Sequence, residues 1–138
     1  MEKSLVLVKP DAMERGLAGA IIARLQREGL KLTGLKMLHA DRALAERHYA
    51  MHKGKAFFND LLDYITSTPI VAAAFEGEGV VERIRKIMGA TDPAKAAPGT
   101  IRKDYGLDLQ RNSIHGSDSP ENGEKEVSLF FAKKELFS

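Results

Sequence analysis

A chain of 138 residues, 43% of them hydrophobic, is long enough to bury one core, and we expect residues 1–138 to form a single domain. A net charge of +2 argues against a required nucleic-acid partner, and the lack of cysteine excludes disulfides and thiolate metal sites. No apolar run reaches the roughly 18 residues of a membrane span, and no signal-peptide stretch is evident. We therefore expect a cytoplasmic protein with no membrane contact.

The first elements are a strand, a helix and a second strand. Residues 4–8 (Ser4-Leu5-Val6-Leu7-Val8) are short, apolar and rich in branched side chains, which predicts a buried strand with Lys9 at its end. Residues 16–28 place apolar side chains on one helical stripe, and Gly29 is suited to end that helix. Residues 30–40 alternate as a strand, with a phase slip that predicts a bulge near Gly34.

A pair of helices is predicted next. Asp41 is a suitable N-cap for a helix that continues to about Ala50, and a second helix carries apolar residues as far as Ile65. His48 and His52 have the spacing of a zinc-binding helix. No glutamate follows His48 and no third ligand is evident, so we interpret both as solvated surface histidines rather than metal ligands.

The second half begins with a buried strand over residues 70–75 and a helix over residues 80–88 that ends at Gly89. Residues 90–111 show little periodicity, and a connection of that length in a small domain is typically functional. Ser119 and Pro120 suit the start of a short helical turn. Residues 127–133 alternate, which predicts the fourth strand.

Without the inserted helical pair, the predicted order is βαββαβ. This order indicates an α+β fold, an α/β sandwich of the ferredoxin-like type. It would hold a four-stranded antiparallel sheet with helices packed on one face.

The densest chemistry lies in residues 112–118, Asn-Ser-Ile-His-Gly-Ser-Asp. His115 is surrounded by an amide, two hydroxyls and a carboxylate, and histidine can act as nucleophile or base near neutral pH. Gly116 would let the backbone turn sharply and leave the ring uncovered. A polar turn that carries a solvated histidine is the alternative, because such turns are common.

Other polar residues could join His115 in binding a polyphosphate. Three cations, a hydroxyl and an amide are available: Lys9, Arg85, Arg102, Thr91 and Asn112. Phosphoryl transfer needs mainly charge neutralisation and in-line placement. An imidazole nitrogen can carry the group if an acceptor holds the other nitrogen, and Glu126 is a candidate acceptor. Phe57 or Tyr49 could offer a flat surface to a base. Taken singly, each has an ordinary role as a solvated charge or core aromatic.

Several motifs in this order are specific enough to compare with a known family. They are Leu5 to Asp11, His48-Tyr49, Phe57-Phe58, Met88 to Pro93, Pro98 to Arg102 and Asn112 to Asp118. The whole chain resembles the nucleoside diphosphate kinases. The resemblance implies a ping-pong reaction in which His115 takes the γ-phosphoryl of a nucleoside triphosphate, usually ATP, and passes it to a nucleoside diphosphate.

The resemblance also implies roles for the nucleotide-binding residues. Lys9 and Asn112 match family residues that touch the ribose hydroxyls and phosphates. Arg85, Thr91 and Arg102 match residues that hold the phosphates. Mg²⁺ is expected to arrive with the nucleotide, because it needs few protein ligands.

Further roles follow for the residues around the histidine and the base. Phe57 matches the aromatic on which the base stacks, and stacking tolerates any base. Tyr49 and Glu126 match residues that orient His115, and Ser117 matches a nearby hydroxyl. Ala56 departs from the proline that many relatives carry there. The family forms homo-oligomers, either tetramers or hexamers, and the sequence does not choose between them.

Two other functions deserve comparison. Acyl transfer would use Ser117 as nucleophile and His115 as base, but the G-x-S-x-G motif is missing and the spacing is awkward. A ferredoxin-like nucleic-acid-binding module would need exposed aromatics on the sheet, and residues 5–8 have none. Fold alone does not decide between enzyme and binder.

Overall fold

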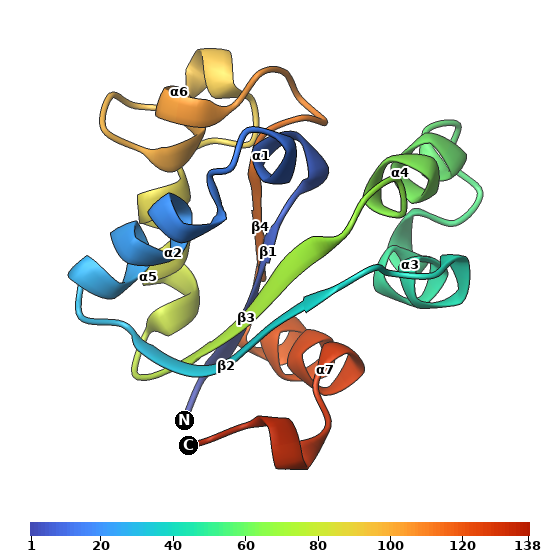
Figure 1. Cartoon of the computed structure of the whole chain (residues 1–138). Coiled ribbons are helices and arrows are strands. Elements are labelled where there is room, and N and C mark those ends of the chain that lie inside the picture. The colour runs from blue at the N-terminus through green and yellow to red at the C-terminus, as the bar shows by residue number, and fades with distance from the viewer.

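In the computed structural model, which describes all 138 residues, the central strand is β1 (Lys3–Val8), buried from Ser4 onward. The sheet order is β2-β3-β1-β4 and neighbouring strands are antiparallel. The other strands are β2 (Lys31–Leu38), β3 (Ile70–Glu76) and β4 (Ile114–Gly116). The predicted α+β, ferredoxin-like class with its inserted helical pair is confirmed (Figure 1).

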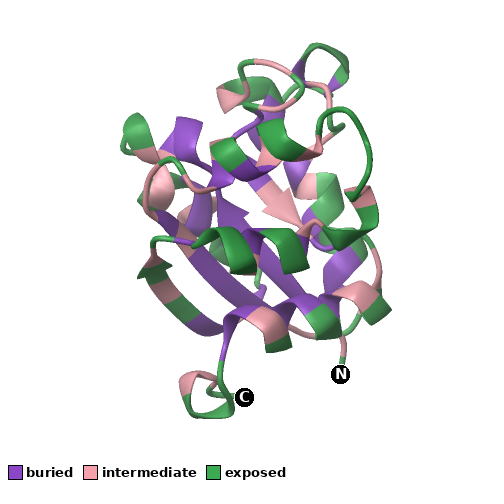
Figure 2. Cartoon of the chain, turned by 90° about the vertical axis from the view of Figure 1, so that its right-hand side faces the viewer, coloured by how far each residue is buried: buried purple, intermediate pink, exposed green.

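Helices cover both faces of this sheet, so the expectation of a single covered face is wrong. One face packs on α1 (Pro10–Glu14), α2 (Ala18–Arg27), α5 (Val80–Met88) and α6 (Ile101–Tyr105). The other packs on α3 (Arg42–His48), α4 (Phe58–Ile65) and α7 (Pro120–Phe130). Successive side chains of β1 point to opposite faces of the sheet. Val6 packs in the core under α2 and α5, and Leu7 packs in the core under α4 and α7. Burial on both faces explains the continuous apolar sequence of β1. Most of the sheet is buried (Figure 2), and its exposed residues, such as Leu35 and Met37, belong to β2.

Most of the predicted boundaries agree with the structure to within a few residues. The bulge lies between Leu32 and Gly34, and the Asp41 side chain caps α3 by accepting from the Leu44 N–H at 2.8 Å. The long connection is partly ordered by α6 and by a 3-10 turn at Pro93–Lys95. Two further 3-10 turns occupy Ala50–His52 and Lys133–Glu135.

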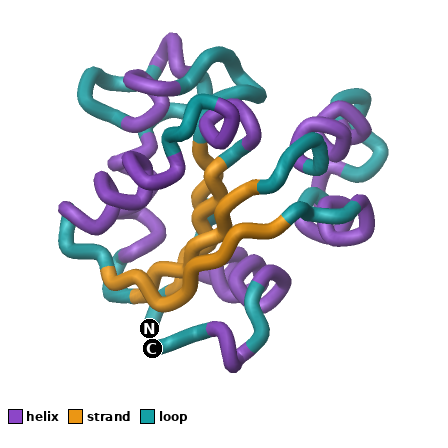
Figure 3. Tube along the Cα trace, in the orientation of Figure 1, coloured by secondary structure: helices purple, strands orange, loops and turns teal.

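The C-terminal prediction is wrong. The expected short turn at Ser119 is the start of α7, which continues to Phe130 and takes in much of the expected strand 127–133 (Figure 3). The buried residues Gly123, Glu126, Val127 and Phe130 recur at helical spacing. The fourth strand is β4, and it carries His115, so this residue lies on a strand rather than a loop.

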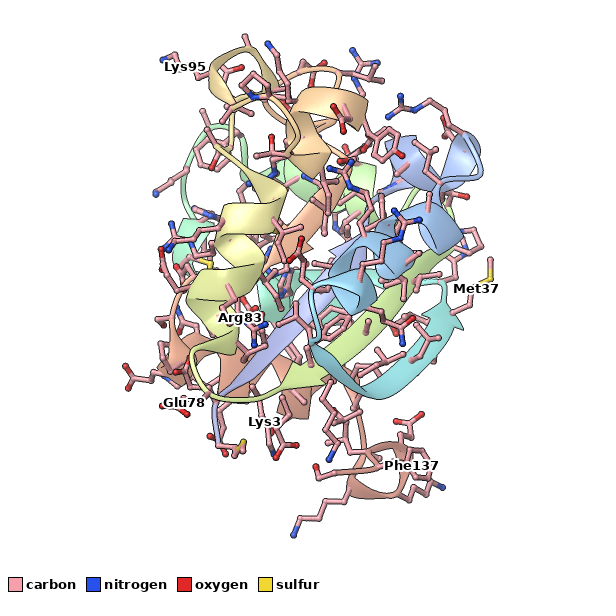
Figure 4. All side chains as sticks on the ribbon, turned by 90° about the vertical axis from the view of Figure 1, so that its left-hand side faces the viewer. Lys3, Met37, Glu78, Arg83, Lys95 and Phe137 are labelled. Atoms are coloured by element: carbon pink, nitrogen blue, oxygen red, sulfur yellow. The ribbon has the colours of Figure 1, made fainter.

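Both chain termini lie at the same end of the molecule (Figure 1). Lys3, at the start of β1, and Phe137, near the C-terminus, lie at one end, whereas Lys95 lies at the other (Figure 4). The Phe137 N–H donates to the Thr33 carbonyl at 2.8 Å, which docks the C-terminal segment on β2. No helix combines the length and apolar character that crossing a membrane demands.

Candidate active site

A cavity of about 1260 Å³ lies where β1 ends and β4 begins. The helices α4 and α6 lie on opposite sides of this end of the sheet (Figure 1). Nine of the ten residues proposed from the sequence line the cavity: Lys9, Tyr49, Phe57, Arg85, Thr91, Arg102, Asn112, His115 and Glu126. The tenth, Ser117, is fully buried behind Glu126. The fold therefore brings together side chains from both halves of the chain.

His115 is held between the sheet and α7. Its backbone pairs with Leu7 of β1, and its ring Nε2 lies 3.0 Å from Oε1 of Glu126. Burial raises the pKa of the Glu126 carboxyl, but the hydrogen bond and charge of His115, with the Ser117 hydroxyl, outweigh this and keep that pKa below its usual value. Glu126 is thus ionised near neutral pH. It can hold a proton on Nε2 and leave Nδ1 unprotonated.

Ser117 connects this pair to the sheet. Its hydroxyl donates to Glu126 Oε1 at 2.7 Å and accepts the N–H of Leu5 at 2.9 Å. The Ser117 hydroxyl is fully buried and acts as both donor and acceptor within the protein, so it cannot serve as a nucleophile toward a substrate. The acyl-transfer alternative is therefore excluded.

Lys9 and Asn112 form a buried polar pair on the cavity wall. Lys9 Nζ donates to Asn112 Oδ1 at 2.9 Å and to the Gln110 carbonyl at 2.6 Å. The Asn112 amide donates in turn to the Thr91 carbonyl at 3.0 Å. Burial, reinforced by the charge of Arg102, lowers the pKa of Lys9 to about 8. The Lys9 ammonium is therefore held in place by two hydrogen bonds and loses its proton at a lower pH than an exposed lysine.

Two arginines follow on the side of α5 and α6. Arg102 is buried and donates to the carbonyls of Gly89 at 3.1 Å and Ile114 at 2.8 Å, while its Nε has no partner. Burial, and then the charge of Arg85, lowers the pKa of Arg102 to about 10. Arg85 is exposed and weakly tied, because it donates to the Asp118 carbonyl at 3.4 Å and lies 3.9 Å from Glu82. Gly89, at φ 87°, would place a Cβ 2.5 Å from the Thr100 hydroxyl oxygen, so this corner needs glycine.

Aromatic rings line the side formed by α3 and α4. Phe57 is 44% exposed, which is unusual for a phenylalanine, and its ring contacts that of His52 at a centroid distance of 5.2 Å. The Tyr49 ring also lines the cavity. Its hydroxyl makes no hydrogen bond to His115 or Glu126. Burial raises the pKa of Tyr49 to about 12. The exposed Phe57 is suited to stack on a planar ligand.

Two backbone details differ from what the sequence suggested. Gly116 is not a sharp turn; a Cβ there would lie 2.7 Å from Met88 Sδ, so glycine permits close packing of α5 on β4. The unusual backbone is at Ser113, the single non-glycine residue with positive φ (73°), which presents its carbonyl to the Lys9 N–H at 3.0 Å. No sequence signal marks that position.

His48 is not a surface residue either. It is 4% exposed, and its ring meets those of His115 and Phe130 edge-on at 4.8 and 5.3 Å. Burial, together with His115, lowers its pKa to about 3. The helical stripe that turns Ala45 and His48 inward was the available signal.

Comparisons with known proteins agree on one family. The family model for nucleoside diphosphate kinase matches residues 2–136. The nucleoside diphosphate kinase of Dehalococcoides mccartyi is 57% identical over 136 residues, which cover 99% of this chain and 96% of the relative. Among solved structures, the Halobacterium salinarum nucleoside diphosphate kinase in complex with CDP is 48% identical, with a TM-score of 0.96 over 99% of this chain and 91% of that one. The Aquifex aeolicus nucleoside diphosphate kinase is 40% identical, with a TM-score of 0.94 over 98% of each chain.

Proposed function

The chain belongs to the nucleoside diphosphate kinase family and is an enzyme of that family, and we propose that it works by a ping-pong route through a phosphohistidine at His115. The γ-phosphoryl group of a nucleoside triphosphate, usually ATP, passes to the ring and the nucleoside diphosphate leaves. A second nucleoside diphosphate then takes the group. The observation that carries this proposal is the hydrogen bond of 3.0 Å between His115 Nε2 and Glu126.

That hydrogen bond assigns different tasks to the two ring nitrogens. Nε2 keeps its proton against Glu126, so Nδ1 has the free lone pair and attacks the γ-phosphorus. The N–P bond forms as the bond from the γ-phosphorus to the bridging oxygen breaks. Positive charge that develops on the ring is stabilised by the carboxylate, and Ser117 holds that carboxylate in place at 2.7 Å.

Cations around the cavity offset the charge of the phosphates. Arg85 is exposed and weakly paired, and the Arg102 side chain lines the cavity, so both can donate to phosphate oxygens. The Thr91 side chain is exposed at the same cavity and can add a hydroxyl. We propose that these three hold the phosphates, as the corresponding residues do in the family.

The sugar and base take the remaining wall. Lys9 and Asn112 are already fixed to one another and can reach a ribose hydroxyl or a phosphate oxygen. Phe57 offers an exposed ring face on which a base can stack without base-specific contacts. This arrangement supports the transfer of phosphoryl groups among nucleotides with different bases.

Mg²⁺ is the cofactor that we propose, bound together with the nucleotide. Besides Glu126, the carboxylates that line the cavity are Glu82 on α5 and Asp108 and Asp118 on loops, and together they supply few oxygen ligands. This suits an ion held mostly by phosphate oxygens and water. When bound, the ion offsets charge on the phosphates.

A labelling experiment tests the phosphohistidine. The protein is incubated with γ-labelled ATP and Mg²⁺, and free nucleotide is then removed. Acid-labile, base-stable label that moves to any added nucleoside diphosphate is expected. His115→Asn should abolish labelling, and His39→Asn, at an exposed histidine outside the cavity, is the matched control. Full labelling of His115→Asn would assign the nucleophile to another residue.

We also propose that the chain forms a homo-oligomer, a tetramer or a hexamer. Leu35 and Met37 are 53% and 65% exposed on the edge strand β2, where apolar side chains and unpaired backbone groups favour association. Sedimentation of the native protein separates the two sizes, and a monomer at micromolar concentration would contradict the proposal.

A further inference from the structure

Directly behind the ring of His115 lies a second imidazole that has no role in the reaction described above. His48 comes from the last turn of α3, and only 2% of its side chain is exposed. Neither ring nitrogen has a hydrogen-bond partner. Buried polar atoms in proteins are nearly always paired, so two unpaired nitrogens on one buried ring call for an explanation.

One of these nitrogens, Nδ1, faces another group that can bind a metal. His48 Nδ1 lies 4.0 Å from Oε2 of Glu126, the carboxylate oxygen that accepts no hydrogen bond. One donor atom each from His48, His115 and Glu126 lie within 4.8 Å of one another. His48 also lines the nucleotide cavity, so an ion that enters the cavity can reach the group.

Two imidazoles and one carboxylate are the donor set of several zinc sites that keep a fourth position open. Bonds of 2.0–2.1 Å in a tetrahedron place donor atoms about 3.3 Å apart. The separations of 3.0 Å from His115 Nε2 to Glu126 Oε1 and of 4.0 Å from His48 Nδ1 to Oε2, the other oxygen of the same carboxylate, lie on either side of that value. Because the three donor atoms all lie within 4.8 Å of one another, no pair has to close by more than about 1.5 Å. Rotation of the His115 ring, which is 23% exposed, can supply much of this movement.

We propose that His48, His115 and Glu126 form an inhibitory site for a borderline divalent ion of the Zn²⁺ type. Imidazole nitrogen suits such ions and does not suit Mg²⁺, which prefers oxygen, so the cation of the nucleotide would not compete. The ion replaces the proton on His115 Nε2, and that proton leaves to solvent. The metal bond withdraws electron density from the ring and fixes its orientation, so Nδ1 can no longer attack phosphorus. The inhibition rests on the proposed function, whereas the binding does not.

Binding is tested first, on metal-free protein without nucleotide. Zn²⁺ is titrated in competition with a chromophoric chelator, and Co²⁺ provides a second readout through the visible absorption of a four-coordinate site. One ion per chain is expected. His48→Gln should lower Zn²⁺ affinity at least tenfold, and His52→Gln, at a cavity histidine outside the group, should leave it unchanged. If His48→Gln fails to fold, His115→Asn must show the same loss.

Inhibition is tested next by labelling with γ-labelled ATP and Mg²⁺ after one equivalent of Zn²⁺ has been loaded. Loss of label, restored by a chelator, is the expected result. Zinc that binds with equal affinity to the His48 and His115 variants, or that does not bind at all, would overturn the site. Zinc that binds while labelling continues would overturn the inhibition. A metal-free protein that takes no label would instead refute the proposed function and leave the binding result standing.

Discussion

Gly123→Ala should destabilise the protein even though alanine is the better helix former. Gly123 lies in α7, and an added Cβ would be 1.9 Å from the Lys3 carbonyl oxygen of β1. Real Cβ contacts rarely fall below 3.0 Å, so the helix must retreat by about 1.1 Å, the difference between the two distances. Overpacking of this severity lowers the free energy of unfolding by about 3 kcal/mol, and the higher helix propensity of alanine offsets about 1 kcal/mol of this loss. We expect a net loss of about 2 kcal/mol in the free energy of unfolding.

The same displacement should reach the active site. Glu126 is one helical turn beyond Gly123, and its hydrogen bond to His115 is 3.0 Å long, so a shift of about 1 Å breaks it. Urea denaturation at one protein concentration measures the stability, and the rate of His115 labelling measures the site. Gly19→Ala is the matched control, because Gly19 is exposed in α2 with no atom near its added Cβ, and it should gain up to about 1 kcal/mol. A Gly123→Ala protein as stable as its parent would refute the packing argument.

Three further predictions concern charged groups at the site. Glu126→Gln removes a charge-assisted hydrogen bond of about 1.5–3 kcal/mol and should slow labelling of His115 about 10- to 150-fold in rapid-quench experiments, and an unchanged rate would contradict its role. Because the pKa of Lys9 is about 8, its ammonium is present below that pH and lost above it. The affinity for nucleotide should therefore fall between pH 7 and 9. Lys9→Met should bind nucleotide more weakly at pH 7, and its affinity should not fall over this pH range. The pKa of His48 is about 3 against 6.5 in the unfolded chain, so the unfolded state takes up a proton that the folded state refuses, and stability falls as pH drops from 6.5 toward 3. At pH 5, which is 1.5 units below the unfolded pKa of 6.5, the loss in the free energy of unfolding is about 2 kcal/mol. If the urea midpoint of His48→Gln fell with pH as much as that of the parent protein, the assignment to His48 would be refuted.

The elements that the sequence predicted well are those with a strong local signal. The apolar run of β1, the stripe of α2 and the Asp41 cap each reflect short-range physics, and each lies close to where it was expected. The failure at residues 127–133 has a local cause. Alternation over seven residues mimics a strand, while the buried set that begins at Gly123 has helical spacing and is recognised only over a longer window.

The site shows the same division. Each chemical group could be named from residue type and motif, because imidazole, guanidinium and carboxylate limit the chemistry that is available. The hydrogen bond from His115 to Glu126 needed α7 to exist as a helix packed on β1. The two buried polar networks, of Lys9 and of Arg102, use backbone carbonyls whose positions no motif encodes. His48 was misjudged because its burial depends on how α3 packs against α7.

By itself, the sequence determined the fold class, the family resemblance and the list of groups able to handle phosphate, because local patterns and motifs carry that information. Only the tertiary structure decided which nitrogen of His115 is free, how the pKa of Lys9 falls and why His48 lies unpaired behind the site. Each of these depends on distances between residues far apart in the chain. Desolvation and hydrogen bonding act through space, and the positions that set them are established only when the helices close over both faces of the sheet.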